Sequence, residues 1–253
     1  MTIMQLSSKQ KKATIGIVLL LVIAAISYYI SERKVALPTM TVQEKKARFI
    51  SLIVPAVDHV YHDLMSQYED VKGIIDSGKN NSEIEKLKTE YKASTDRELL
   101  MALKPHPKSI AIAQAAMESS WATSRFFLEA NNIFGVWSFD ESEPRIAALK
   151  KRGDKTIWVR EYGSIEQSVY DYYRTLARGN AFKEFRKATM KTDDPHVLVT
   201  KLDRYSEKGS VYGKELSAII KFNHFDDYDN DDMITAEEAE ADIETTEVED
   251  DME

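Results

Sequence analysis

Cysteine is absent from the 253 residues of this chain, which excludes disulfide bonds and thiolate metal sites. The absence is compatible with an oxidising compartment but does not require one. No nucleic-acid-binding motif is present, and the basic residues are scattered along the chain, so a nucleic-acid partner is not expected. The length is enough for one medium-sized domain with appendages.

Basic residues are missing from one end of the chain. From Asp226 onward there are 15 acidic residues and no lysine or arginine. The net charge of −8 therefore conceals a body, residues 1–225, that carries about +7. A mildly basic body favours an acidic polymer as its partner.

Charge is also missing from Ala13 to Ile30, a stretch of 18 residues that is just long enough to span a bilayer as a helix. The residues before it are basic at Lys9, Lys11 and Lys12. This pattern predicts a cytoplasmic tail over residues 1–12 and a transmembrane signal anchor over residues 13–30. A cleaved signal peptide is the alternative, because Ala25 and Ser27 form a small-x-small site.

Residues 31–94 predict a short linker followed by a helical hairpin. Apolar residues recur every three or four positions from Thr41 to about Ser77, which is the period of an amphipathic helix. Pro55 lies inside this run and is expected to kink or divide the helix. A breaker cluster at residues 78–82 precedes a second, highly charged helix over residues 83–92.

The most informative stretch of the chain is residues 107–139. Between Ile110 and Met117 every residue except Gln114 is apolar, and a helix that is apolar on almost every side is a buried helix. Glu118 follows at the C-terminal end of this helix. Burial and the negative end of the helix dipole both raise the pKa of a carboxyl group, which suits a general acid. A solvated or ion-paired surface glutamate is the alternative.

Aromatic and amide side chains crowd the residues that follow Glu118. Flat apolar rings stack on sugar faces, and directional hydrogen bonds hold hydroxyl and acetamide groups. We therefore predict a sugar-binding site in this stretch; the alternative is that the aromatic residues simply belong to the core. The aromatic members are Trp121, Phe126, Phe127, Phe134, Trp137 and Phe139, and Asn131, Asn132 and Gly135 interrupt them.

The segment AQAAMESSWATSRF, followed by NNIFGVWSF, resembles the signature of glycoside hydrolase family 73, the N-acetylglucosaminidases that cleave peptidoglycan. Within that family it is most similar to the membrane-associated Bax-like branch. The later pieces VREYGSIEQSVYDYYRTL and LDRYSEKGSVYGKELSAIIKFNHF extend the resemblance over residues 95–229. The resemblance implies an α+β fold: a mainly helical, lysozyme-like domain over residues 95–225 with a small β-hairpin lobe, preceded by the membrane helix and the helical hairpin.

Residues 140–160 are polar, contain a Gly153-Asp154 pair and end in a strand-like run, which predicts the β-hairpin. In lysozyme-like folds such a lobe forms the second wall of the sugar cleft. Its acidic residues are therefore candidates for a second catalytic carboxylate. The candidates are Glu141, Glu143 and Asp154. The alternatives are that these are solvated loop charges, or that the acetamide group of the sugar assists instead.

The resemblance also gives roles to two tyrosines. Tyr205 lies in the segment RYSEKGSVY, at the position proposed to orient the substrate or the catalytic water, and Tyr162 is placed near the cleft. The family often carries an Asp-Pro pair after the first of these tyrosines, where this chain has Glu207-Lys208-Gly209. The predicted catalytic residues are Glu118, Tyr205, Glu143 and Asp154. The predicted substrate-binding residues are Trp121, Asn131, Asn132, Phe134, Gly135, Trp137, Tyr162 and Tyr212.

The acidic tail, residues 226–253, opens with a calcium-binding pattern. Asp227, Asp229, Asp231 and Glu238 occupy positions 1, 3, 5 and 12 of an EF-hand loop. Asp232 stands at position 6, where glycine normally makes the sharp turn, so the pattern is weakened. A calcium site is predicted on the four carboxylates, and an acidic disordered tail is the alternative.

The sequence thus predicts a single-pass inner-membrane protein whose periplasmic domain hydrolyses β-1,4 bonds of peptidoglycan as an endo-β-N-acetylglucosaminidase. Glu118 would protonate the leaving oxygen, and no cofactor would be required. A lytic transglycosylase, which also works with a single glutamate, is the related alternative. A non-enzymatic wall-binding or adaptor protein on a lysozyme-like scaffold is the alternative from another class.

Overall fold

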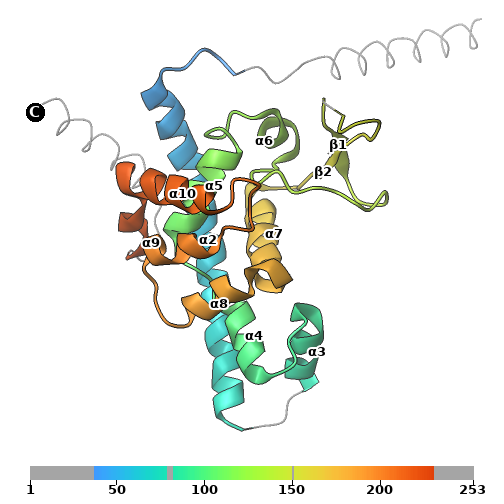
Figure 1. Ribbon diagram of the computed structural model, residues 1–253, viewed down its shortest axis with the longest axis vertical. Coiled ribbons are helices and arrows are strands. Elements are labelled where there is room, and N and C mark those ends of the chain that lie inside the picture. The colour runs from blue at the N-terminus through green and yellow to red at the C-terminus, as the bar shows by residue number, and fades with distance from the viewer. Residues whose placement is uncertain (1–36, 79–81, 150, 231–253) are drawn as a thin grey trace, which may run out of the picture. The chain divides into compact units, whose positions relative to one another are not determined.

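A computed structural model describes residues 37–78, 82–149 and 151–230 of the chain (Figure 1). The described residues from Met40 to Asn230 belong to one compact unit. The predicted anchor at residues 13–30 and the part of the acidic tail from residue 231 lie outside the described residues. None of the helices in the described part combines the length and the apolarity that a bilayer crossing needs.

The described chain is mainly helical and carries one small antiparallel sheet, in agreement with the predicted α+β class. Its α-helices are α2 (Val42–Asp76), α3 (Ser82–Tyr91), α4 (Asp96–Leu103), α5 (Lys108–Glu118), α6 (Arg125–Ala130), α7 (Ile165–Arg178), α8 (Lys183–Thr189), α9 (Pro195–Leu198) and α10 (Ser210–Phe222). Its 3₁₀ helices are η1 (Asn180–Phe182), η2 (Val199–Lys201) and η3 (Phe225–Asp229), and its strands are β1 (Arg145–Ala147) and β2 (Trp158–Arg160).

The long helix α2 runs through 35 residues without a break, and Thr41 and Glu44 cap its start reciprocally. Pro55 lies inside the helix, which continues through it, so the division that the sequence offered as one outcome is absent. The neighbours of the proline on both sides are buried: Ile53, Val54, Ala56 and Val57. Their packing offsets the roughly 3 kcal/mol that an interior proline costs a helix.

The centre of the core is α5, as its apolar sequence predicted. All of its residues from Lys108 to Ala116 are buried, and α2, α10 and η3 pack around it. Figure 1 shows the green α5 between α2 and the red-orange α10. Because four of its residues are alanines, the neighbouring helices can approach its axis closely.

A smaller apolar cluster lies at the other end of α2, where that helix packs with α3 and α4. Its buried members are Tyr68, Val71, Ile84, Leu99 and Leu103. Thr95 caps α4 by accepting the N–H of Glu98. The first half of α2 therefore belongs to the main core and its second half to this cluster. In this way α2, the first helix of the predicted hairpin, joins the hairpin to the rest of the unit.

The predicted hairpin lobe is present. The strands β1 and β2 pair in antiparallel register, with Ile146 opposite Val159, and Trp137 adds an isolated bridge to Val159. The guanidinium group of Arg145 lies 4.4 Å from the centre of the Trp158 ring, a cation–π contact along the pair. These contacts join the hairpin to the turn that follows α6.

The start of α5 holds a buried ion pair. Lys108 Nζ lies 2.7 Å from Asp58 Oδ1 of α2, and both side chains are only 2% exposed. Two charges at this depth are compensated only while both are present, because a single one would be left desolvated. The pair therefore fixes where α5 begins along α2.

We expect Lys108→Met to lower the free energy of unfolding by about 3–5 kcal/mol, since it leaves the Asp58 carboxylate buried without its ammonium partner. Urea unfolding followed by circular dichroism measures the loss. Lys187→Met is the matched control, because it removes an exposed lysine from an ion pair within α8. We expect that control to change stability by less than about 1 kcal/mol. Equal losses in the two variants would contradict the assignment.

A close backbone approach also constrains α10. A Cβ atom on Gly213 would lie 2.5 Å from the carbonyl oxygen of Val199, whereas one on Gly73 of α2 would meet nothing within 4 Å. Gly213→Ala should therefore destabilise the protein by about 1–3 kcal/mol through overpacking. Gly73→Ala should stabilise it by about 0.5–1 kcal/mol through helix propensity. Thermal unfolding of both variants tests the opposite signs, and a stabilising Gly213→Ala would refute the close approach.

Candidate active site

Glu118 is the last residue of α5, at the point where the buried helix reaches the surface. Its carboxyl oxygen Oε1 lies 2.9 Å from the hydroxyl oxygen of Tyr212 in α10. Burial raises the pKa of this carboxyl group, while the Tyr212 hydroxyl and the Lys208 ammonium act in the opposite direction. The prediction that Glu118 has a raised pKa is confirmed in direction, and desolvation is its first cause.

The backbone turns sharply directly after Glu118. Ser120, Trp121 and Ala122 have φ values of 55°, 61° and 56°, so three consecutive residues with side chains are left-handed. Such a conformation costs about 1–2 kcal/mol per residue and persists only where surrounding contacts impose it. Here the N–H of Trp121 donates to the carbonyl of Ala116 and the guanidinium of Arg48 donates to the carbonyl of Ala122. The turn therefore ends α5 at a fixed position.

Two tyrosines lie together beside Glu118. The rings of Tyr205 and Tyr212 stack with centroids 5.3 Å apart and an angle of 14° between their planes. The sequence assigned Tyr205 to catalysis and Tyr212 to substrate binding. In the structure the hydroxyl of Tyr212 is the one that contacts Glu118, and Tyr205 supports the ring of Tyr212 from its face.

The candidates for a second carboxylate lie on the hairpin lobe. Glu143 is bound to Arg160 of β2 at 3.2 Å, and Glu141 is bound to Arg145 of β1 at 3.2 Å. Asp154 is exposed in the turn between the two strands. Glu143 therefore already has a cationic partner, and Asp154 is exposed to solvent.

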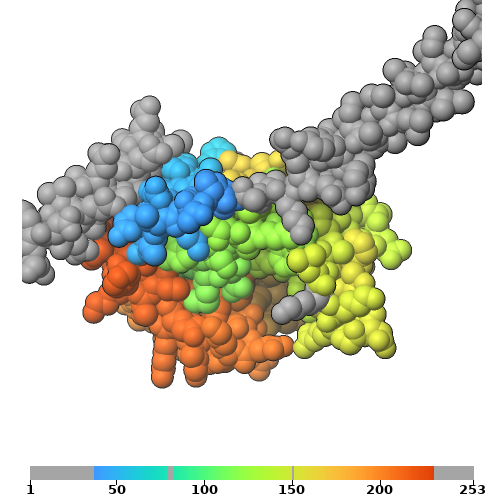
Figure 2. Space-filling view, turned by 90° about the horizontal axis from the view of Figure 1, so that it is seen from above, coloured from blue at the N-terminus to red at the C-terminus, as the bar shows by residue number. Residues whose placement is uncertain are grey.

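The hairpin lobe and the loop before α10 face each other across the site. Figure 2 shows the yellow hairpin and the orange residues near 200 on two sides of a hollow in the surface, with the green residues around α5 and α6 beside it. Arg152 of the hairpin lies 3.3 Å from Glu207 of the opposite loop, an exposed ion pair that connects the two sides. Exposed pairs of this kind contribute little stability.

Several predicted substrate-binding residues instead shape the turn after α6. The Asn132 amide nitrogen donates to the carbonyls of Val136 and Arg160, its oxygen accepts the N–H of Val136, and its side chain is buried. Asn131 is the left-handed cap of α6 and donates to the carbonyl of Tyr162. Gly135 turns the chain with φ of 66°. The hydrogen-bonding capacity of Asn132 is thus used inside the protein, which is a correction to its predicted role.

The predicted aromatic residues divide into two groups. Phe134 is buried and stacks on Tyr172 with ring centroids 4.0 Å apart, and Trp121 packs on Phe49 at 5.1 Å. Phe134 belongs to the core, the alternative that the sequence left open, and Trp121 is partly buried and packs against that core. In contrast, Trp137 is 41% exposed, and its ring centroid lies 6.1 Å from that of the exposed Phe139.

Tyr162 is held by Asp171, in the middle of α7. Its hydroxyl donates to Asp171 at 2.6 Å, and the same carboxylate oxygen lies 2.9 Å from Arg160. Sequence reasoning missed Asp171, and it also missed Gln114, whose amide nitrogen lies 2.9 Å from the Tyr212 hydroxyl. A signal for Gln114 was available: it is the one polar residue in the apolar run and stands one helical turn before Glu118.

The predicted calcium loop begins inside the described part of the chain. Both carboxyl oxygens of Asp229 accept hydrogen bonds from Ser109, from its N–H at 2.8 Å and its hydroxyl at 2.6 Å, so Asp229 caps the start of α5. Asp231 and Glu238 lie outside the described residues. Within the described part no group of three or more metal-ligating side chains is present, and the calcium site stays a prediction.

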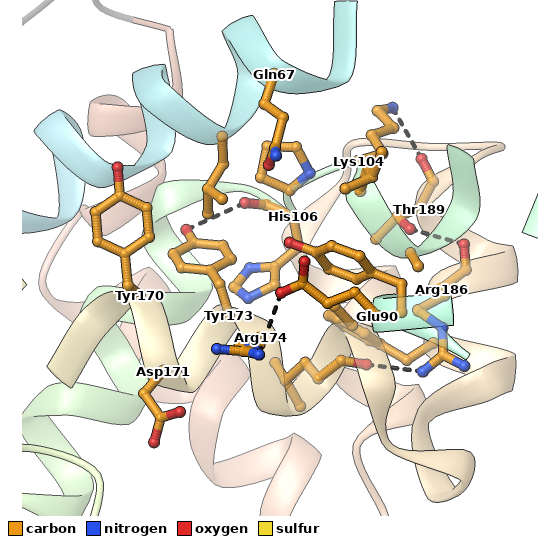
Figure 3. Close-up of a pocket in the computed structure, with 18 of the residues that line it drawn as sticks. Gln67, Glu90, Lys104, His106, Tyr170, Asp171, Tyr173, Arg174, Arg186 and Thr189 are labelled. Carbon is orange, nitrogen blue, oxygen red and sulfur yellow. Dashed lines mark hydrogen bonds and ion pairs between the residues drawn. The ribbon is translucent and has the colours of Figure 1, made fainter. Parts of the chain in front are cut away.

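A separate cavity of about 330 Å³ lies between α2, α3, α4, α7 and α8. Figure 3 shows His106 and Tyr173 in its wall and the Glu90–Arg174 ion pair across it. His106 is 3% exposed, and burial lowers the pKa of its ring to about 4. The residues that line this cavity include none of those predicted for catalysis or sugar binding.

Known proteins resemble the part of the chain that carries this site. Residues 97–225 match the family model Glucosaminidase, described as mannosyl-glycoprotein endo-beta-N-acetylglucosaminidase. Protein bax of Escherichia coli (strain K12) is 32% identical over 123 residues, which are 46% of this chain and 43% of that protein. Exo-glucosaminidase LytG of Bacillus subtilis (strain 168) is 29% identical over 128 residues, which are 48% of this chain and 45% of that protein. The chain thus spans less than half the length of both relatives.

Two solved structures are also similar. The catalytic domain of the autolysin Auto from Listeria monocytogenes is 18% identical, with a TM-score of 0.45, over 90% of this chain and all of that one (100%). A peptidoglycan hydrolase from Sphingomonas sp. A1 is 22% identical, with a TM-score of 0.39, over 51% of this chain and 86% of that one. At TM-scores below 0.5 these likenesses are too distant to support a functional conclusion.

The raised pKa of Glu118 predicts how stability depends on pH. The folded state holds the carboxyl proton more tightly than the unfolded state, so stability falls as pH rises from about 4.5 through the folded pKa. Glu118→Gln removes this loss. We expect the free energy of unfolding of the variant to rise relative to that of wild type between pH 4 and pH 8. The rise should be at most about 1.4 kcal/mol per pH unit within that window.

Urea unfolding at both pH values measures the gain. Glu69→Gln, on an exposed position of α2, is the control and should show no such growth. A Glu118→Gln variant whose stability relative to wild type is the same at pH 4 and pH 8 would contradict the burial of this carboxyl group.

Proposed function

The chain belongs to the Glucosaminidase family, glycoside hydrolase family 73, and from this premise we propose that it hydrolyses β-1,4 bonds of peptidoglycan as an endo-β-N-acetylglucosaminidase with Glu118 as its general acid. The observation that carries the proposal is the half-buried carboxyl group of Glu118, which is raised in pKa and faces Tyr212 at the end of a core helix. A raised pKa lets a carboxyl group hold its proton to higher pH, which suits protonation of a glycosidic oxygen.

The chemistry follows from that proton. Glu118 donates it to the glycosidic oxygen as the bond to the anomeric carbon breaks, and positive charge develops on the sugar ring. Because Glu143 is paired with Arg160 and Asp154 is exposed to solvent, we favour the acetamide oxygen of the substrate as the group that captures the anomeric carbon. Water then displaces the acetamide oxygen from that carbon, which restores the acetamide group, and the water gives a proton to the Glu118 carboxylate.

Exposed aromatic residues support the sugar-binding part of the proposal. Trp137 and Phe139 present their rings at the edge of the hairpin lobe. Flat rings of this kind suit the apolar faces of sugar residues along a glycan strand. The helical domain with its hairpin lobe is consistent with the lysozyme-like arrangement that family membership implies.

Localisation is a further element of the proposal. The uncharged stretch at residues 13–30, with its basic flank, supports an inner-membrane anchor that holds the domain in the periplasm. A domain attached in this way would meet peptidoglycan as its partner, and the basic body of the chain suits an acidic polymer.

The experiment is mass spectrometry of purified sacculi digested with the wild type and with Glu118→Gln. We expect wild type to release fragments that end in a reducing N-acetylglucosamine, and Glu118→Gln to lower their rate of release by about 10²–10⁴. Glu69→Gln should behave like wild type, because that residue is exposed on α2.

Other products identify the alternatives. Anhydro ends would indicate a lytic transglycosylase, and single sugars released from chain ends would indicate an exo-acting enzyme, the activity in the name of LytG. Wild type that releases nothing beyond the Glu118→Gln variant, while still binding sacculi, would instead support a non-enzymatic wall-binding protein.

A further inference from the structure

A continuous chain of hydrogen-bonded side chains crosses the core and ends at Glu118. His106 Nε2 lies 3.0 Å from the hydroxyl of Tyr172, which lies 2.6 Å from the amide oxygen of Gln114. The other atom of that amide lies 2.9 Å from the hydroxyl of Tyr212, which lies 2.9 Å from Glu118. All members except Glu118 are at most 3% exposed. Water is thus excluded from the four linked groups.

The far end of the chain fixes where its hydrogens lie. His106 Nδ1 is 3.0 Å from the carbonyl oxygen of Pro107, and a carbonyl only accepts, so Nδ1 carries a hydrogen. The ring is packed among aromatic residues, stacked on Tyr173 at 4.5 Å and edge-on to Phe185 at 5.3 Å. Full burial keeps the ring neutral at neutral pH. His106 Nε2 therefore carries a lone pair and must accept a hydrogen bond.

The remaining hydrogens follow in sequence, because each tyrosine hydroxyl has one hydrogen to give. As the amide is placed in the structure, its oxygen accepts from Tyr172 and its nitrogen donates to Tyr212. When Tyr172 instead donates to His106, the Gln114 amide must give a hydrogen to Tyr172. A half-turn of that amide exchanges its nitrogen and oxygen and moves no other residue. The amide oxygen then faces Tyr212, which donates to it. The Tyr212 oxygen is left as an acceptor toward Glu118, and only a protonated carboxyl group can donate there.

The opposite arrangement holds the same number of hydrogens. There Tyr212 donates to an ionised Glu118, Gln114 donates to Tyr212, and Tyr172 donates to Gln114. His106 Nε2 must then carry a second hydrogen, which makes the buried ring an imidazolium. The two arrangements thus differ in the position of one proton, at Glu118 or at His106. Burial of the histidine ring favours the first, since it separates no charge.

We propose that His106, Tyr172 and Gln114 are positioning residues that act through Tyr212 to keep the catalytic proton on Glu118. The inference rests on the proposed function of Glu118 as general acid. It assigns a purpose to the one polar residue within the apolar run of α5 and to a histidine that lies two tyrosines and an amide away from the reaction.

Other charged groups face the two ends of the chain. At Glu118, Lys208 from the loop before α10 favours the ionised carboxylate. Around His106 the cavity wall carries charges from α3, α4, α7 and α8 (Figure 3), most of them engaged: Arg174 with Glu90 at 3.1 Å, Lys104 with Asp193 at 2.8 Å, and Arg186 with the carbonyls of Leu176 and Gly179. The arrangement that keeps the proton on Glu118 therefore acts against the effect of Lys208, which favours the ionised carboxylate.

Two neighbouring tyrosines of α7 provide a matched test. Tyr172→Phe removes a hydroxyl from the chain, whereas Tyr173→Phe removes one from a buried ring that stacks on His106 outside the chain. Without the Tyr172 hydroxyl, Gln114 is free to donate to Tyr212 and Tyr212 to the carboxylate. The ionised form of Glu118 is then favoured, so its pKa should fall.

The first readout is the pH profile of the release of reducing ends from sacculi by the full chain. We expect Tyr172→Phe to move the limb on the basic side to lower pH by about one unit. Tyr173→Phe should leave that limb in place. A loss of rate with no movement of the limb would mean that Tyr172 has a packing role only, and would overturn the inference.

The second readout needs no cleavage. At pH 8, Glu118→Gln should lower the unfolding equilibrium constant in the wild-type and Tyr173→Phe backgrounds. In the Tyr172→Phe background we expect this stabilising factor to be about tenfold smaller. Gln114→Met is the second variant, to be used if Tyr172→Phe does not fold, and the same reduction is expected. Equal gains in all backgrounds overturn the inference even where sacculi are cleaved, whereas a reduced gain without cleavage overturns only the proposed function.

Discussion

The burial of α5 from Lys108 to Ala116 is the constraint on which the rest of the structure depends. A buried helix can carry polar side chains only where another element satisfies them, and α5 carries four. Lys108 is matched by Asp58 of α2, Ser109 by Asp229 of η3, Gln114 by tyrosines of α7 and α10, and Glu118 by Tyr212. Each polar position of this helix therefore fixes the place of one neighbour, and the candidate site is the last of these positions.

The end of α5 is fixed as firmly as its beginning. The left-handed residues 120–122 carry strain that a free chain would relax, and contacts from Ala116, Ser119 and Arg48 impose it. Such a turn stops the helix abruptly and leaves the Glu118 side chain at the boundary between the core and the surface. Burial on one side and access on the other are the two properties that a general acid needs, and both come from this boundary.

The hairpin lobe and the loop before α10, on the two sides of the site, are less constrained than the end of α5 that carries Glu118. The hairpin lobe is a two-stranded sheet of three residues per strand, and its link to the loop before α10 is an exposed ion pair between Arg152 and Glu207. A sheet of this size adds little stability of its own. The rigid helical core thus holds the proton donor, while the exposed rings of Trp137 and Phe139 lie on the smaller lobe.

The sequence by itself determined the buried helix, the carboxyl group at its end, the hairpin and the family signature, because periodicity and motif spacing are properties of neighbouring residues. The tertiary structure alone decided which side chains meet. Tyr212 reaches Glu118 from 94 positions away, and Tyr172 reaches Gln114 from 58. It also placed Phe134 in the core and Trp121 against it, and used the Asn132 amide within a turn. Local sequence does not specify which partners a folded chain brings to a given side chain.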